Sequence, residues 1–135
     1  MVERDLVLAK VATVDRCLDR IAQVTGGDPA SLRNLDVTDV YVLNLQRAVQ
    51  ACIDLASHLV AEKQLGLPST LKEAFTLLGR GGGLEATLAG RMERMVGFRN
   101  VAVHDYQALD PAVLEAIFLR HLGDLRAFCG YALRA

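Results

Sequence analysis

The sequence predicts an all-α protein, an up-and-down bundle of four to five helices that forms one domain over residues 1–135. Apolar residues recur every three or four positions in five segments, which is helical spacing. No stretch alternates apolar and polar residues with the β-branched enrichment typical of strands. Glycine and proline residues separate the helical segments. A chain of 135 residues is too short for two domains that would each bury a sizeable core.

Two long helices are predicted in the first half of the chain. The first covers about residues 4–24 and ends at Gly26, since glycine readily adopts the backbone that closes a helix. The second covers about residues 37–64, with Asp36 or Thr38 as its N-cap. At 1.5 Å per residue the second helix is about 40 Å long, and it is the longest that the sequence predicts.

Three helices are predicted in the second half. The third begins after Ser69 and ends at Gly79. The glycine-rich stretch 79–83 is interpreted as an interhelix loop, because it lacks the Lys-Ser/Thr pair of a phosphate-binding loop. The fourth helix covers about residues 84–104. Pro111, in the favoured first-turn position, opens a fifth helix that continues to the C-terminus.

Composition and charge exclude several classes of protein. Hydrophobic residues make up 52% of the chain and charged residues 23%, which excludes disordered and low-complexity classes. The formal net charge of -1 excludes a polycation that binds nucleic acid through its overall charge. Any phosphate-binding surface must therefore be local.

The sequence also indicates a cellular compartment. Cys17, Cys52 and Cys129 form no CxxC pair, so we expect small buried thiols in a reducing compartment. The N-terminus lacks the apolar region of a secretory signal, and no apolar run approaches the roughly 18–20 residues of a membrane span. We therefore expect a cytoplasmic protein without a membrane segment.

One group of metal-ligating side chains lies on the second predicted helix. Asp54, His58 and Glu62 are spaced four residues apart and share one helix face. Such a group could bind a metal ion, but two or three ligands on one exposed helix seldom close a metal site. We favour a surface ladder of charges and predict no metal site.

The stretch 92–106 holds the most concentrated set of chemically useful side chains. It places Arg99, Asn100, His104 and Tyr106 within eight positions. Arginine can bind a phosphate through two parallel hydrogen bonds, and histidine can move a proton near neutral pH. Because RNA carries its own nucleophile in the 2′-hydroxyl, an arginine and a histidine can suffice for phosphodiester cleavage without a metal ion.

The spacing of this pair poses a geometric difficulty. On an ideal helix, Arg99 and His104 point about 140° apart and cannot share the centre of one face. Either the helix ends or bends near His104, or a second copy of the chain completes the site. A two-fold dimer would bring two copies of each residue to one cleft, which supplies both a general acid and a general base.

The charge around this stretch is locally positive. Residues 80–99 contain four arginines and two glutamates. Doubled in a dimer, this excess would form a modest positive groove for RNA. An ordinary solvated helix face explains the charge pattern equally well.

The segment from Arg99 to Tyr106, RNVAVHDY, resembles the R-x-x-x-x-H-x-Y signature of the HEPN superfamily, and more closely that of its HepT toxin branch. Residues 45–62, LQRAVQACIDLASHLVAE, are similar to a characteristic helix of that family. Gly97 and Phe98 lead into the motif in a similar way. The resemblance extends over nearly the whole chain.

The resemblance implies a small all-helical homodimer, encoded beside an MNT-type nucleotidyltransferase antitoxin. It implies metal-independent cleavage of RNA without a cofactor, with Arg99 holding phosphate and His104 as the acid–base group. Asn100 would orient the motif or the substrate. Tyr106 matches the position that the partner nucleotidyltransferase modifies with AMP, which would block the toxin by adding a phosphodiester charge and an adenosine in the cleft.

Two other functions remain compatible with the sequence. The chain could be a non-catalytic HEPN helical module that binds nucleotide or the nucleotidyltransferase as a scaffold or regulator. It could also be a helical assembly protein in which Arg99, His104 and Tyr106 are structural. A neighbouring gene for a short nucleotidyltransferase would favour the first two functions over the third.

Overall fold

The computed structural model of the protein describes residues 3–135 and is all-helical over that range, which confirms the predicted fold class. Six α-helices and two short 3-10 helices, η1 and η2, make up the described chain. In chain order they are α1 (Arg4–Thr25), η1 (Pro29–Arg33), α2 (Leu35–Glu62), α3 (Leu71–Gly81), α4 (Ala86–His104), η2 (Tyr106–Ala108), α5 (Pro111–Arg120) and α6 (Leu122–Arg134).

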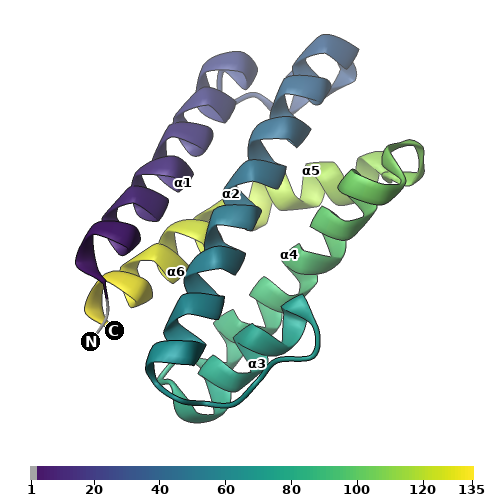
Figure 1. Cartoon of the computed structure of the whole chain (residues 1–135). Helices are drawn as coiled ribbons and strands as arrows, with labels where there is room; N and C mark the ends of the chain where they lie inside the picture. Colours follow the sequence, from purple (N-terminus) through teal and green to yellow (C-terminus); the bar gives the residue numbers. More distant parts are fainter. Residues whose placement is uncertain (1–2) are drawn as a thin grey trace.

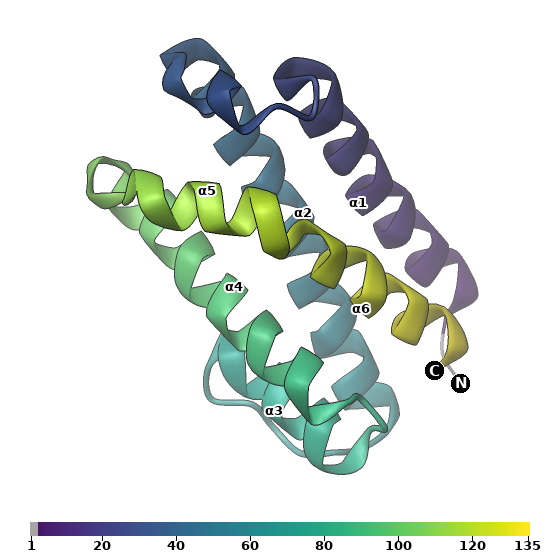
Figure 2. The same cartoon turned by 180° about the vertical axis from the view of Figure 1, so that it is seen from behind.

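The helices run up and down the bundle. Figure 1 shows α1 and α2 side by side in opposite directions, with α3 at one end of the bundle and α4 returning toward the other. Seen from behind in Figure 2, α5 and α6 follow one another along nearly one line across the bundle. The start of α1 and the end of α6 lie close together, and Arg4 Nη1 donates to the Leu133 carbonyl oxygen at 3.0 Å.

Helix α2 forms the centre of the bundle. It contacts α1, α3, α4 and α6, and its side chains are buried around most of the helix. Its largest fully buried residues are Tyr41, Leu45, Ile53, Leu55 and Leu59. A helix that is apolar over so much of its surface is stable only when other helices cover it.

Caps define the ends of the first two helices. Helix α1 closes at Gly26, where the sequence predicted its end, and the φ of Gly26 is 62°, in the left-handed region. The predicted N-cap of α2 was wrong. Asn34 is the cap, and its Oδ1 accepts from the amides of Asp36 and Val37 at 2.9 and 3.2 Å. The hydroxyl of the other candidate, Thr38, instead donates to the Leu32 carbonyl oxygen at 2.7 Å.

Helix α3 extends two residues past the predicted end at Gly79, so the glycine-rich stretch is only partly a loop. The helix stops at Gly82, whose amide donates to the Leu78 carbonyl oxygen at 2.9 Å. A Cβ at Gly82 would lie 3.0 Å from that same oxygen, which favours glycine in this turn. Tyr131 of α6 packs beside this turn and donates its hydroxyl to the Gly82 carbonyl oxygen at 2.7 Å.

The predicted fifth helix is divided into α5 and α6 at His121. The backbone of His121 leaves the helical region, with φ of -124° and ψ of -4°. Its ring Nδ1 lies 3.0 Å from Oδ2 of Asp124, a carboxylate that is nine-tenths buried. Arg91 Nη1 of α4 lies 3.5 Å from the other oxygen of Asp124. The interruption therefore coincides with a buried charged group that sequence periodicity does not reveal.

The three cysteines and Asp54, one of the three possible metal ligands on α2, contribute to the packing of the bundle. Cys17, Cys52 and Cys129 are buried free thiols, as predicted. Asp54 accepts from Lys10 Nζ at 2.8 Å and from Gln50 Nε2 at 3.0 Å, so it joins α1 to α2. Within residues 3–135, no helix combines the length and apolar character needed to cross a bilayer.

We predict that Tyr41→Phe destabilises the protein by about 1 kcal/mol, the usual net value of a buried hydrogen bond. Tyr41 is fully buried, burial raises the pKa of its phenol, and its hydroxyl donates to the Leu114 carbonyl oxygen of α5 at 2.8 Å. Urea unfolding measures the change, with Tyr106→Phe as the exposed control, for which we expect less than roughly half that effect. Equal stability of both variants would contradict the anchoring of α5 through this bond.

Candidate functional site

The RNVAVHDY motif occupies the last turn and a half of α4 and the start of η2. His104 is the final residue of α4. Asp105 follows with φ of -152° and ψ of 67°, and its amide closes the helix by donating to the Val101 carbonyl oxygen at 2.8 Å. The helix therefore ends at His104, but His104 is still its last helical residue, so the ring stays on a different side of α4 from Arg99.

One side of α4 changes character along its length. Met92 and Val96 are fully buried and lie one turn apart on the side that faces the core. Arg99, Asn100 and Val103 follow Val96 by three, four and seven positions and therefore continue the same side. None of the three is fully buried. Arg99 and Asn100 therefore occupy positions that would face the core if the core extended as far as the carboxyl end of α4. Figure 1 shows α4 diverging from α2 toward this end.

Arg99 is half-buried and incompletely paired. Its Nη1 donates to Asn100 Oδ1 at 3.1 Å, so the Asn100 amide helps to orient the guanidinium. Its Nε is buried and has no acceptor among residues 3–135. A buried donor without an acceptor costs free energy, and most such groups in native proteins have a partner. No carboxylate of residues 3–135 forms an ion pair with Arg99, so its positive charge is not neutralised within the described chain.

His104 is exposed at the carboxyl end of α4. No hydrogen bond or ion pair joins its ring to any other part of residues 3–135, including Arg99. The ring can therefore meet a substrate directly and exchange a proton with it.

Tyr106 makes a long-range contact that local sequence patterns cannot predict. Its hydroxyl donates to Oδ1 of Asp39, on the first turns of α2, at 2.5 Å. Partial burial and this negatively charged acceptor raise the pKa of Tyr106 to about 12. The phenol is therefore neutral at physiological pH, and its proton is hydrogen-bonded to the Asp39 carboxylate. Sequence analysis missed Asp39 because 67 residues separate the pair.

Exposed apolar side chains lie beside this contact. Leu35 is 78% exposed and Leu43 is 43% exposed, and they lie four residues before and after Asp39 on the same side of α2. Val103 of the motif is 42% exposed. Leu35 and Leu43, two large exposed apolar residues on one side of α2, are of the kind found on surfaces that contact another protein.

Comparison with known proteins places this fold and motif in a family. The model of the family described as ribonuclease HepT-like matches residues 14–132. The chain is 39% identical over 124 residues to the mRNA nuclease HepT of Shewanella oneidensis, covering 92% of this chain and 93% of that protein. It is 37% identical over 67 residues to the tRNA nuclease HepT of Aphanizomenon flos-aquae, covering 50% of this chain and 46% of that protein.

Solved structures agree with this assignment. A toxin–antitoxin complex with AMP-PNP contains a chain that is 36% identical, with a TM-score of 0.91 over 97% of this chain and 99% of that one. The tri-AMPylated HEPN toxin of Shewanella oneidensis in complex with MNT antitoxin is 37% identical, with a TM-score of 0.90 over 97% and 98% of the two chains. The fold and the motif define an all-helical HEPN protein. The chain belongs to the HepT-like family of that superfamily.

We predict that Asp39→Ala lowers the pKa of Tyr106 from about 12 toward the ordinary tyrosine value of about 10. The substitution removes an acceptor and a negative charge, both of which favour the neutral phenol, while the effect of burial remains. Ring-labelled tyrosine NMR measures the titration, and Asp36→Ala removes a neighbouring carboxylate as the control. An unchanged titration would show that Asp39 does not hold the Tyr106 hydroxyl in solution.

Proposed function

We propose that the chain is a metal-independent ribonuclease and the toxin of a toxin–antitoxin pair whose antitoxin is an MNT-type nucleotidyltransferase. One observation carries the proposal. The Nε of the half-buried Arg99 lacks an acceptor, and the exposed His104 lies five residues away on the same helix, in a chain 39% identical to an mRNA nuclease. A guanidinium that binds the phosphate and an imidazole that moves a proton are sufficient for cleavage of an RNA phosphodiester.

The reaction uses the nucleophile of the substrate itself. The RNA 2′-hydroxyl oxygen attacks the adjacent phosphorus, the bond from phosphorus to the 5′-oxygen breaks, and a cyclic phosphate forms. One imidazole accepts the 2′-hydroxyl proton and a protonated one donates to the departing 5′-oxygen. Arg99 stabilises the charge that develops on the non-bridging oxygens, so the chemistry requires no metal ion.

A homodimer supplies the second imidazole. A single chain carries one His104, and the reaction needs an acid and a base at the same time. A two-fold axis near the motif would place the two copies of Arg99 and His104 in one cleft. The exposed side chains of Leu35, Leu43 and Val103 support this arrangement, since their burial between two copies would favour association.

Modification of Tyr106 by the nucleotidyltransferase would turn the toxin off. The Tyr106 oxygen attacks the α-phosphorus of ATP, pyrophosphate leaves, and the phenol proton passes to the Asp39 carboxylate that already accepts it in a hydrogen bond. The product carries a phosphodiester charge and an adenosine two residues after His104. There it competes with RNA for the same cationic group and the same space.

Replacement of the motif residues tests the nuclease. We expect purified protein without its partner to cleave mixed RNA in EDTA, and Arg99→Ala and His104→Ala each to lower the rate by about 100-fold or more. Arg20→Ala, which removes an exposed arginine of α1, is the matched control, and this variant should cleave RNA at the wild-type rate. Intact mass on the same sample establishes that the protein carries no AMP. Unmodified wild type that leaves RNA intact would favour the non-catalytic HEPN module instead.

Co-expression with the partner tests the switch. We expect Tyr106→Phe to remain toxic when the nucleotidyltransferase is present, because the variant lacks the oxygen that receives AMP. Growth of the host measures toxicity, and Tyr131→Phe is the control, since that hydroxyl lies at the α3–α4 turn. Full neutralisation of Tyr106→Phe by the partner would show that modification of this residue is not the mechanism.

A further inference from the structure

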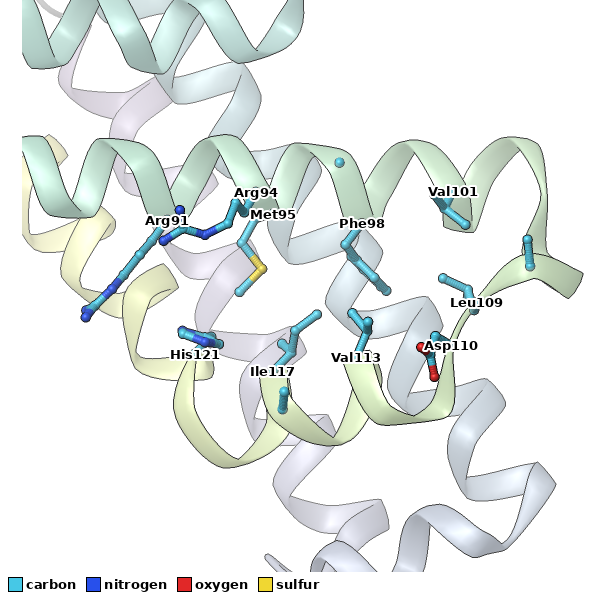
Figure 3. Close-up of a pocket in the computed structure, with 13 residues that line it drawn as sticks. Arg91, Arg94, Met95, Phe98, Val101, Leu109, Asp110, Val113, Ile117 and His121 are labelled. Atoms are coloured by element: carbon cyan, nitrogen blue, oxygen red, sulfur yellow. The ribbon is translucent and has the colours of Figure 1, made fainter.

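A groove runs between α4 and α5 and shares one residue, Val101, with the motif. Its volume is about 380 Å³, and Figure 3 shows side chains of the two helices pointing into it from both sides. Neither Arg99 nor His104 lines it. The volume falls within the range of sites that bind small molecules, roughly 300–1,000 Å³, which also bury most of their ligand against apolar side chains.

The lining has an apolar part, a cationic end and, at the opposite end, the carboxylate of Asp110, which accepts from the Ala112 amide at 2.9 Å. Met95, Phe98 and Ile117 form much of the apolar surface. Arg91 and Arg94 lie at the end of the groove where α5 reaches His121 (Figure 3). An apolar slot with cations at one end matches a ligand that has a flat ring and a phosphate.

The cationic end is held in place by a buried carboxylate. Asp124 is nine-tenths buried and lies 3.0 Å from the His121 ring and 3.5 Å from Arg91. These contacts engage Arg91 and His121. Arg94 is exposed and forms no ion pair within residues 3–135, so its charge is available to a ligand.

A continuous side of α4 connects the groove to the motif histidine. Arg94, Gly97, Val101 and His104 are spaced three, four and three residues apart, which aligns them along one side of the helix. The first three line the groove, and none of the four is fully buried. Lys72 of α3 lies over Gly97, since a Cβ there would be 3.6 Å from its Nζ. Two cations therefore flank the path from the groove to His104.

We infer that this groove binds a nucleotide of the RNA strand that neighbours the cleaved linkage, with the base against Phe98 and Met95 and the phosphate on Arg94. The inference rests on the proposed ribonuclease function. Single-stranded RNA is commonly held in this way, by bases packed on aromatic or apolar side chains and backbone phosphates on lysine or arginine. Charge complementarity and the small volume favour a nucleotide over a segment of a partner protein.

Binding of an uncleavable strand tests the site apart from catalysis. The probe is a fluorescein-labelled 12-nucleotide 2′-O-methyl oligoribonucleotide, which lacks the attacking hydroxyl. We expect Arg94→Gln to weaken its binding roughly fivefold to tenfold at low salt and to reduce the slope of log K against log salt by about 0.7. Ala116→Leu fills the groove without altering charge and should weaken binding while leaving that slope unchanged. Arg20→Gln, an equal loss of charge on α1, should bind as wild type does.

The outcomes separate this inference from the proposed function. Wild type that binds the probe but cleaves no RNA would overturn the ribonuclease proposal and leave the groove as a nucleotide site, provided that both groove variants weaken binding. Wild type that cleaves RNA, with both groove variants binding like Arg20→Gln, would overturn the inference. Loss of nucleotidyltransferase binding in Arg94→Gln with unchanged RNA binding would also overturn it and assign the groove to the partner. Circular dichroism melts show whether each variant is folded.

Discussion

The arrangement of the whole chain depends on the need to cover α2 from several sides at once. Thirteen of its 28 residues are buried, whereas an ordinary surface helix buries a single stripe. Helices α1, α3, α4 and α6 provide the cover, and α5 is anchored to α2 by the hydroxyl of Tyr41. The first turns of α2 extend beyond this cover, and no residue from Leu35 to Val40 is buried. The uncovered end is where Asp39 meets the tyrosine of the motif.

Helix α4 packs in the core with its first part and carries the polar side chains of the motif on its last part. Its first part buries Met92 and Val96 against the bundle. The same side then carries Arg99 beyond the core, close enough to be half-buried but too far out to find an acceptor for Nε. Packing of the first part fixes the position of the second, so the guanidinium is oriented without being neutralised. Functional groups on a rigid helix are held more precisely than groups on a loop.

Local patterns in the sequence predicted most of the helices, the motif and the end of α4, since periodicity, glycine and proline act over a few residues. They failed where the outcome depends on distant contacts. The interruption at His121 coincides with a buried Asp124 that also engages Arg91, 33 residues earlier. Asp39 joins Tyr106 across 67 residues and has no neighbouring signal. The groove between α4 and α5 depends on how the two helices pack, and no local sequence pattern predicts it.

The 3-10 helix that carries Tyr106 contributes no buried residue to the hydrophobic core. None of the residues of η2, Tyr106–Ala108, is buried. A substituent on the Tyr106 oxygen would therefore leave the packed interior as it was. Proteins that lose stability are removed by proteases in the cell, and a modification that spares the core avoids that fate. Under the modification proposed above, the folded chain would persist in the cell whether or not Tyr106 carries AMP.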